Sequence, residues 1–306
     1  MQFLIKSEEN GKTVRDFLKM QGVSAALCAK LKRLPHGILL NGARVTVRAV
    51  LQAGDVLSLA IEDEAKNEKL LPLEREVEIV CENDDFLIVN KQPFMPTHPS
   101  HGHFADTLAN ALVWHYRHQP HFCPRFVNRL DRNTSGAVLV AKHALSAAKL
   151  SGAMAGGEIQ KTYYAVVCGT IEGETVLKTG IRRQTESIIF REVCPEGEGD
   201  IAITHIVPLC AKNGYTLVHL IPKTGRTHQL RVHLAHLGAP IAGDELYGRK
   251  SPLIARHALH AATLTFPAPM GDGTVHACAP IVPDMAALIT KIFGQEVRET
   301  LAGAKC

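Results

Sequence analysis

The stretch RFVNRLDRNTSGAVLVAK, residues 125–142, joins a charged loop directly to an apolar run. Residues 137–141, Ala-Val-Leu-Val-Ala, predict a buried strand, because a short apolar run bounded by turn residues is typical of one. Asp131 lies between Arg129 and Arg132 just before this strand. An aspartate in a polar loop is usually a turn or capping residue. A carboxylate at a half-buried reactive centre instead needs a cation that keeps it ionised, so this stretch alone leaves both interpretations open.

The segments around this stretch predict more strands than helices. Residues 77–91 predict two strands joined by a turn at Asn83-Asp84. Two segments have helical patterns, residues 107–118 and 145–155. Further strands, rich in β-branched and aromatic residues, are predicted at residues 161–169, 203–210 and 215–222. Because strands and helices do not strictly alternate, we expect an α+β fold and not a doubly wound parallel sheet.

The first 61 residues predict a separate small α/β unit. Its two helices are expected at residues 12–21 and 24–34, the second capped by its initial serine. An Asn-Gly pair at residues 41–42 then predicts a hairpin between two short strands. The charged segment 62–75 predicts a linker to the remainder of the chain.

Positive charge is concentrated in this N-terminal unit. It holds nine Lys and Arg residues against four acidic residues, a net charge of +5, whereas the whole chain of 306 residues has a net charge of +4. A basic module on a near-neutral body suggests a polyanionic partner. A solvated basic surface without a function is the alternative, and charge alone does not decide between them. The candidate RNA-binding side chains, which can share one side of the helix pair, are Arg15, Lys19, Lys30 and Arg33.

A second basic motif, KTGRTHQLRVHLAHLG, spans residues 223–238. From Thr227 onward it predicts a helix with an apolar stripe, Leu230, Leu234 and Leu237, that ends before Gly238. Two other side chains, His228 and Arg231, are three residues apart and are expected on another face. Lys223 and Arg226 precede the helix, whose first N–H groups would also favour a phosphate. A basic amphipathic surface helix is the alternative interpretation.

Several classes of function lack support in the sequence. The eight cysteines form no C-x-x-C pair, which argues against a zinc ribbon or a thioredoxin-like site. The cluster of His115, His118, His121 and Cys123 has no common metal-ligand spacing, so we predict no metal. The chain also lacks the P-loop, dinucleotide-binding, nucleophile-elbow and zinc-deaminase motifs. No apolar run is long enough to span a bilayer, and the acidic start does not resemble a signal peptide, so a cytoplasmic protein is expected.

Four motifs occur in a fixed order over about half the chain: NRLDRNTSG, QKTYYAVVCG, TGRTHQLRVHLAHLGAPIAGDELYG and RHALHAATLTFPAP. Together they resemble the RluA-type pseudouridine synthases over roughly residues 75–290. The N-terminal unit resembles the S-four RNA-binding domain of ribosomal proteins and RNA-modifying enzymes. The resemblance implies a mixed or antiparallel sheet with flanking helices. It implies three parts: an RNA-binding domain at 1–61, a linker at 62–75 and a catalytic domain at 76–306.

The resemblance also implies roles for individual residues. Asp131 matches the catalytic aspartate, and Arg231 matches the arginine that pairs with it. Tyr163 matches the tyrosine that packs on the uracil, and Arg129 matches the arginine that helps displace the target base. Arg226 and His228 lie in the same motif as Arg231 and are expected to support the RNA or the site. Asn128 departs from the family pattern, which has His three residues before the aspartate, and this places the local hydrogen bonding in question.

The implied reaction is the isomerisation of uridine in RNA. The bond between the ring nitrogen and the ribose breaks, the base turns, and carbon 5 bonds to the ribose, so neither a cofactor nor a metal is required. We expect a monomer that acts on ribosomal RNA, with transfer RNA as the other possibility. Two alternatives are an RNA-binding protein of the same fold that has lost catalysis and acts in ribosome assembly, and a relative that acts on a small pyrimidine compound.

Overall fold

The N-terminal unit is built on its own small sheet. The computed structural model describes residues 1–60, 70–119, 121–185, 187, 189–195 and 197–303. The unit contains, in chain order, β1 (Gln2–Leu4), the 3-10 helix η1 (Ser7–Glu9), α1 (Val14–Met20), α2 (Ala25–Arg33), β2 (Ile38–Leu40), β3 (Ala43–Arg44) and β4 (Val56–Leu59). Its sheet has the order β1-β4-β2-β3. The predicted linker lies partly outside the described residues, since its residues 62–69 are not among them.

Local sequence signals explain these elements. Ser24 Oγ accepts a hydrogen bond from Leu27 N at 3.1 Å, which confirms the predicted cap of α2. Val14, Phe17 and Leu18 of α1 are buried, as the helical pattern predicts. The Asn41-Gly42 pair has positive φ at both positions and joins β2 to β3, so the predicted hairpin is confirmed.

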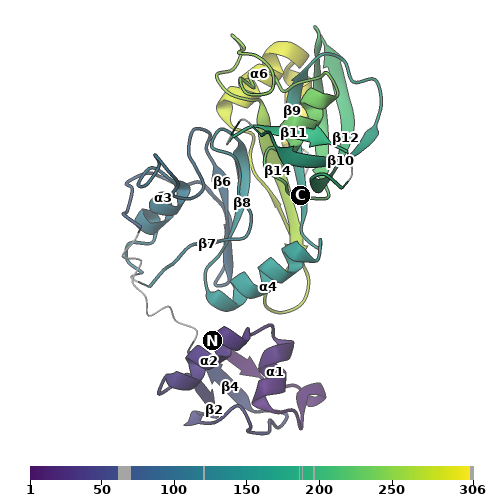
Figure 1. Cartoon of the computed structure of the whole chain (residues 1–306). Helices are drawn as coiled ribbons and strands as arrows, with labels where there is room; N and C mark the ends of the chain where they lie inside the picture. The colour runs from purple at the N-terminus through teal and green to yellow at the C-terminus, as the bar shows by residue number, and fades with distance from the viewer. Residues whose placement is uncertain (61–69, 120, 186, 188, 196, 304–306) are drawn as a thin grey trace.

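The second sheet has eleven strands and forms the centre of the remaining chain (Figure 1). Its strands are β5 (Ile79–Glu82), β6 (Phe86–Lys91), β7 (Arg125–Phe126), β8 (Ser135–Ala141), β9 (Gln160–Cys168), β10 (Thr175–Arg183), β11 (Arg191–Cys194), β12 (Asp200–Lys212), β13 (Tyr215–Pro222), β14 (Leu259–Pro267) and β15 (Thr274–Cys278). Nine of them follow the order β11-β10-β12-β13-β9-β14-β8-β6-β5, while β15 pairs with β14 and β7 with β8. Among the described strands, β8 and β14 form a parallel pair and the other pairs are antiparallel, which confirms a mixed α+β fold.

Helices lie around this sheet. They are α3 (Leu108–His115), α4 (Ala144–Ala155), α5 (Gln229–His236), α6 (Pro283–Phe293) and α7 (Gln295–Gly303). The predicted helix at 107–118 is confirmed but ends at His115, since residues 116–118 form a turn. The strands predicted at 161–169, 203–210 and 215–222 correspond to β9, β12 and β13.

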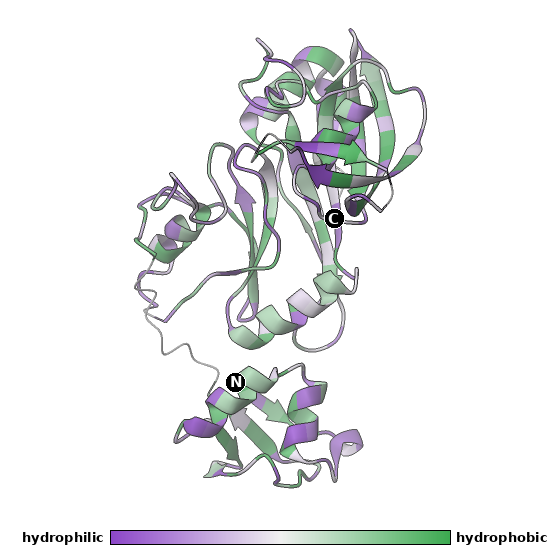
Figure 2. Cartoon of the chain, in the orientation of Figure 1, coloured by the Kyte–Doolittle hydropathy of each residue, from purple (hydrophilic) through white to green (hydrophobic). Residues whose placement is uncertain are grey.

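The strand β8, which follows the opening loop, is buried along its entire length. Figure 2 shows hydrophobic residues along the central strands and hydrophilic stretches on the helices of the N-terminal unit. Gly136 at the start of β8 has a φ of +112°, and a Cβ there would lie 2.1 Å from the carbonyl oxygen of Ala261 on β14. The glycine therefore permits β8 and β14 to approach, and this fixes the end of the loop that carries Asp131.

The N-terminal unit packs against α4 of the second part (Figure 1). Leu145 of α4 is fully buried in the same apolar cluster as Phe17 and Leu18. The Nζ of Lys149, one turn along α4, donates to Gln21 Oε1 at 3.2 Å. Apolar burial and one polar contact thus join the two parts across α4.

Candidate active site

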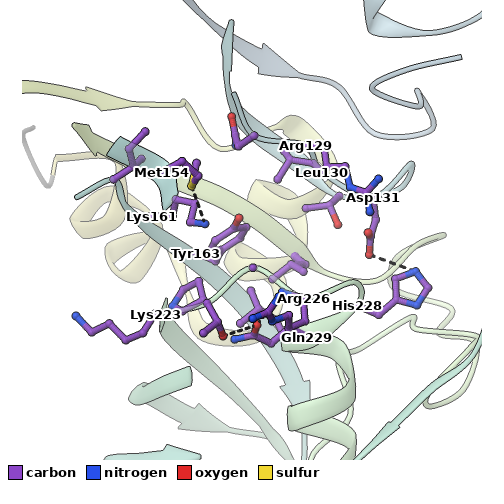
Figure 3. Close-up of a pocket in the computed structure, with 18 of the residues that line it drawn as sticks. Arg129, Leu130, Asp131, Met154, Lys161, Tyr163, Lys223, Arg226, His228 and Gln229 are labelled. Carbon is purple, nitrogen blue, oxygen red and sulfur yellow. Dashed lines mark hydrogen bonds and ion pairs between the residues drawn. The ribbon is translucent and has the colours of Figure 1, made fainter. Parts of the chain in front are cut away.

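One cavity of about 460 Å³ brings together distant parts of the sequence (Figure 3). Its walls come from the loop before β8, the end of α4, strand β9, the segment between β13 and α5, and the first turn of α5. Six predicted site residues line it: Arg129, Asp131, Tyr163, Arg226, His228 and Arg231. The basic residues of the N-terminal unit, Arg15, Lys19, Lys30 and Arg33, are exposed on α1 and α2 and do not line it.

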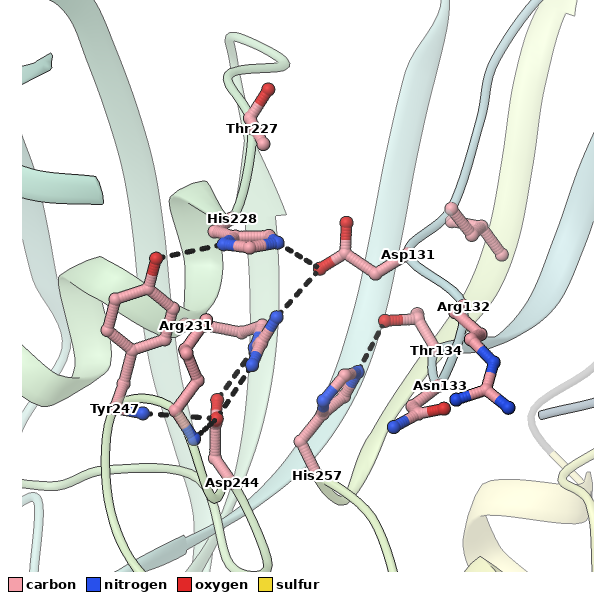
Figure 4. Close-up of polar contacts among 12 residues, drawn as sticks. Asp131, Arg132, Asn133, Thr134, Thr227, His228, Arg231, Asp244, Tyr247 and His257 are labelled. Carbon is pink, nitrogen blue, oxygen red and sulfur yellow. Dashed lines mark hydrogen bonds and ion pairs between the residues drawn. The ribbon is translucent and has the colours of Figure 1, made fainter. Parts of the chain in front are cut away.

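Asp131 pairs with an arginine from across the cavity. Arg231 Nη1 donates to Asp131 Oδ2 at 3.2 Å (Figure 4). The guanidinium is 8% exposed and the carboxylate 29% exposed, so the pair is accessible from the carboxylate side. Within the described ranges, neither Arg129 nor Arg132 forms an ion pair with Asp131. The geometry therefore favours a reactive centre over a simple turn for the opening stretch.

A second carboxylate, Asp244, fixes the orientation of Arg231. Two hydrogen bonds of 2.7 Å join Arg231 Nε to Asp244 Oδ2 and Arg231 Nη2 to Asp244 Oδ1. Burial raises the pKa of Asp244, but the hydrogen bonds and charge of Arg231 outweigh burial and lower it overall. The bidentate contact leaves Nη1 directed at Asp131. The sequence interpretation gave Asp244 no role, although it lies in the GDELYG segment of a matched motif.

His228 lies beside the same carboxylate. Its Nε2 is 3.8 Å from Asp131 Oδ2, and its Nδ1 is 2.8 Å from the hydroxyl of Tyr247. That hydroxyl also accepts a hydrogen bond from Arg191 N at 2.9 Å, so its own proton is free to be donated to Nδ1. In the tautomer that accepts this proton, Nε2 carries the imidazole proton and faces Asp131. Burial lowers the pKa of His228, so the neutral ring is favoured.

The predicted start of the helix here is wrong. α5 begins at Gln229, and His228 has a left-handed backbone with φ of 57°. His228 therefore does not share a helix face with Arg231, and both reach Asp131 because the backbone turns between them. Leu237, predicted in the apolar stripe, follows the helix and is 39% exposed. Residues 229–234 are all buried, so the alternative of an amphipathic surface helix is also wrong.

Two buried cations hold the loop that carries Asp131. Lys91, fully buried, donates to the carbonyl oxygens of Gln92, Met95 and Arg132 at 3.0, 2.8 and 3.1 Å. Burial lowers the pKa of Lys91 to about 7, while three carbonyl acceptors use all three protons of the ammonium form. Arg256, 1% exposed, donates to the carbonyl of Asn133 at 3.0 Å. In the sequence, Lys91 and Arg256 each lie next to an apolar run, and this signal of a buried cation was not used to predict a role for either residue.

The remaining side chains of the cavity are less constrained. Tyr163 on β9 is 9% exposed, and burial, together with the charge of Asp131, raises its pKa. Arg129 is exposed, with Nη2 3.5 Å from Thr227 Oγ1. Arg226 is exposed and donates from Nε to the carbonyl of Ile201 at 3.1 Å. Both arginines therefore line the cavity from exposed positions.

Asn128, the departure from the family pattern, points to the backbone of β8. Its Nδ2 donates to Ala137 O at 3.2 Å, and its Oδ1 accepts from Leu139 N at 2.7 Å. The side chain thus pairs with β8 as a neighbouring strand would. The departure affects how the loop is attached to the sheet and leaves the contacts of Asp131 in place.

Neither a metal cluster nor a membrane-spanning helix occurs in the described part of the chain. Within it, no group of three or more His, Cys, Asp and Glu side chains is arranged to hold a metal ion. None of the helices described is both long and apolar enough to cross a membrane.

Comparisons with known proteins agree with this geometry. The family model described as RNA pseudouridylate synthase matches residues 85–236, which include the Asp131 loop and the whole of α5. The RNA pseudouridine synthase YjbO of Bacillus subtilis (strain 168) is 38% identical over 279 residues, which cover 90% of this chain and 98% of that protein. The ribosomal large subunit pseudouridine synthase D of Pseudomonas aeruginosa is 30% identical, with 87% of this chain and 86% of that protein covered.

A solved structure supports the same assignment. Human RNA Pseudouridylate Synthase Domain Containing 1 superposes with a TM-score of 0.59 and 27% identity, covering 75% of this chain and 96% of that one. The resemblance drawn from the four motifs is therefore confirmed, together with the fold it implied. The chain belongs to the RNA pseudouridine synthases, isomerases that convert uridine to pseudouridine in RNA.

Proposed function

We propose that this enzyme isomerises specific uridines of ribosomal RNA, with Asp131 as the catalytic carboxylate. The observation that carries the proposal is the chain of contacts Asp244–Arg231–Asp131 at a cavity that also contains Tyr163. A carboxylate paired with a buried arginine can act on the ribose as a nucleophile or as a base. The same contacts fix its direction before substrate binds.

The other side chains receive roles from their places around the cavity. Tyr163 offers a buried aromatic face against which a flipped uracil can stack. Arg129, exposed at the rim, is suited to occupy the space that the base leaves in the RNA. Arg226 is suited to a phosphate, and His228 to orienting Asp131. The reaction exchanges bonds within one nucleotide, so its chemistry requires no redox partner and no group donor.

The names of related proteins are the reason for proposing ribosomal RNA as the substrate. The names of several of them, such as that from Pseudomonas aeruginosa, specify the large ribosomal subunit. We propose that residues 1–61 form the S-four-like RNA-binding domain, since their helix pair presents exposed cations. The same proposal makes residues 62–75 a linker and residues 76–306 the catalytic domain, acting as a cytoplasmic monomer.

The decisive experiment is a map of pseudouridine in ribosomal and transfer RNA from cells with and without the gene. We expect one or a few ribosomal positions to lose pseudouridine, and to regain it when the wild-type gene is restored but not with Asp131→Asn. If pseudouridine were lost only at transfer RNA positions, transfer RNA would replace ribosomal RNA as the proposed substrate. An unchanged map would favour the alternative of an RNA-binding protein without catalysis. That alternative drew its support from Asn128, whose side chain is engaged with β8 and not with Asp131.

A further inference from the structure

Lys161 is a cation of the cavity wall that has no role in the reaction proposed so far. It lies on β9, two residues before Tyr163, and is only partly exposed. The one described hydrogen-bond contact of its side chain joins Nζ to the thioether sulfur of Met154 at 3.8 Å. Burial lowers its pKa, and no acidic side chain of the described residues counteracts that effect. An ammonium in this position is poorly compensated in the free enzyme.

The position of Lys161 relative to Tyr163 and Asp131 indicates what it faces. Alternate residues of a strand share one face about 6.6 Å apart, and Lys161 and Tyr163 both line the cavity. Figure 3 shows Lys161 on the side of the Tyr163 ring opposite to Asp131. On the facing segment, Gly225 has no side chain, and a Cβ there would lie 3.5 Å from Lys161 Nζ. The ammonium therefore extends across the far end of the cavity.

A uracil stacked on Tyr163 with its ribose at Asp131 would extend its carbonyl edge toward this end. When the N1–C1′ bond breaks, its electron pair remains with the base, and C1′ becomes electron-deficient. The negative charge on the detached uracil is shared between the ring nitrogen and the carbonyl oxygens O2 and O4. A cation at that edge is closer to the charge in the transition state than a cation at the ribose would be.

We propose that the Lys161 ammonium donates a hydrogen bond to a carbonyl oxygen of the flipped uracil and stabilises the negative charge that the base acquires when the glycosidic bond breaks. This proposal rests on the proposed function. Lys161 is then a catalytic residue for departure of the base, while Asp131 and Arg231 act at the sugar. The thioether of Met154 is a weak acceptor that the carbonyl replaces when substrate binds.

The symmetry of uracil allows one lysine to serve both ends of the reaction. A half-turn of the ring about the axis through C6 and N3 exchanges N1 with C5 and O2 with O4. The carbon that bonds to the ribose thus takes the place of the nitrogen that left it, and a carbonyl oxygen again faces Lys161. The proton on C5 is then lost and N1 is protonated, so the atoms of substrate and product balance. Cytosine would present an amino group at one of the two positions, so Lys161 would also select against it.

A phosphate contact by Lys161 is the competing interpretation. The exposed Lys223 at the rim of the same cavity suits the RNA backbone better, because phosphates remain near solvent. The two lysines therefore make a matched pair. Lys161→Met and Lys223→Met remove the same charge, one from beside Tyr163 and one from the rim.

The test compares single-turnover reactions on two transcripts of the large-subunit ribosomal RNA, one with uridine and one with 5-fluorouridine. Fluorine makes the uracil anion more stable, so departure of 5-fluorouracil depends less on a stabilising cation. An enzyme without the Lys161 ammonium should therefore be slowed less on 5-fluorouridine than on uridine. We expect Lys161→Met to slow loss of uridine by roughly 10²–10³-fold, the usual effect of removing one such donor. On 5-fluorouridine, followed as disappearance of that nucleoside after digestion, we expect a defect at least about tenfold smaller. RNA affinity should change little.

Lys223→Met is expected to weaken RNA binding and to reduce its salt dependence, with the same defect on both transcripts. Equal defects of Lys161→Met on both transcripts, or a defect that resides in affinity, would overturn the proposal in favour of a phosphate contact. Thermal unfolding gives a second readout: Lys161→Met should keep or raise the midpoint, because it removes a poorly compensated cation. Turnover of uridine by the wild-type enzyme tests the proposed function separately. An inactive wild-type enzyme would contradict the proposed function, whereas an active wild type with equal defects of Lys161→Met on both transcripts would contradict only the role of Lys161.

Discussion

Arg231 approaches Asp131 from a helix that lies 100 residues away in the sequence, with Nη1 3.2 Å from Oδ2. The same guanidinium is held by Asp244 through two hydrogen bonds of 2.7 Å. The partly exposed carboxylate of Asp131 therefore shares a cation with the buried carboxylate of Asp244, which fixes the direction of the guanidinium. This relationship separates the positions of the two acids: Asp131 faces the cavity, and Asp244 holds the arginine.

We expect Asp131→Asn to abolish pseudouridine formation while RNA binding survives. The amide keeps the shape of the side chain but can neither attack the ribose nor accept a proton as a base. Formation of pseudouridine by purified enzyme on a transcript, with affinity measured in parallel, checks this. Turnover by the Asn variant at the wild-type rate would remove Asp131 from the mechanism.

Asp244→Asn is expected to lower both stability and turnover. Loss of one partner from a buried ion pair costs about 3–5 kcal/mol, because the arginine charge remains uncompensated. Chemical denaturation measures the first effect, and single-turnover kinetics the second. The control is Glu245→Gln in the same loop, since Glu245 is 59% exposed and its ion pair with Lys250 Nζ is loose, at 3.9 Å. A stable, fully active Asp244→Asn enzyme would show that Arg231 does not depend on this contact.

Lys91→Met should reduce turnover while leaving RNA affinity close to normal. The substitution leaves the carbonyls of Gln92, Met95 and Arg132 without the donor they share, at roughly 1–3 kcal/mol for each buried group left unpaired. The loop that holds Asp131 would then lose part of its fixed geometry. Exposed Lys212, changed to Met in parallel, controls for the loss of a charge. If turnover of the two variants were equal, Lys91 would have no positioning role.

The N-terminal unit is expected to supply much of the salt dependence of RNA binding. Replacing Arg15, Lys19, Lys30 and Arg33 together with Gln should weaken binding. It should also reduce the slope of log affinity against log salt by about 0.7–0.9 for each phosphate that the protein no longer neutralises. The comparison is a variant with four exposed cations of the other part replaced, Arg182, Lys212, Lys250 and Arg298. An identical slope before and after the first replacement would count against an RNA role for this unit.

Acid should destabilise the fold below pH 6.5. Burial lowers the pKa of His233 to about 4, that of His260 to about 4 and that of His257 to about 3. The unfolded chain takes up protons near pH 6.5 and the folded chain does not, so stability is complete above 6.5 and falls as the pH drops toward 4. Each histidine contributes up to about 1.4 kcal/mol per pH unit in this window.

Denaturation curves between pH 4 and pH 7 check this prediction. His233→Gln should flatten the pH dependence of the free energy of unfolding, because its ring is fully buried between Thr179 and Thr204. His36→Gln, at an exposed position, should leave the slope as it is. A slope unaffected by His233→Gln would mean that this ring is not responsible.

Local patterns in the sequence determined most of the elements. Ser24 caps α2 through the N–H of Leu27, and the positive φ of Asn41 and Gly42 turns the chain between β2 and β3, so a short window contains the necessary information. The buried strand after Asp131 follows from its continuous apolar run. The family, and with it the positions of Asp131, Tyr163 and Arg231, followed from four motifs in a fixed order.

Only the tertiary structure decided which groups these residues contact. His228 was placed in a helix because its neighbours are helical in pattern, but the packed loop gives it a left-handed backbone. Asp244, Lys91 and Arg256 had no visible role in the sequence, since each contacts a residue on another segment, 13, 41 and 123 positions away respectively. Sequence periodicity reports which face of an element is buried, whereas a hydrogen bond depends on where two distant elements meet. The sequence by itself therefore determined many of the elements and the candidate site residues. The packing of β8, β9, β14 and α5 decided which cation pairs with Asp131 and placed Lys161 at the far end of the cavity.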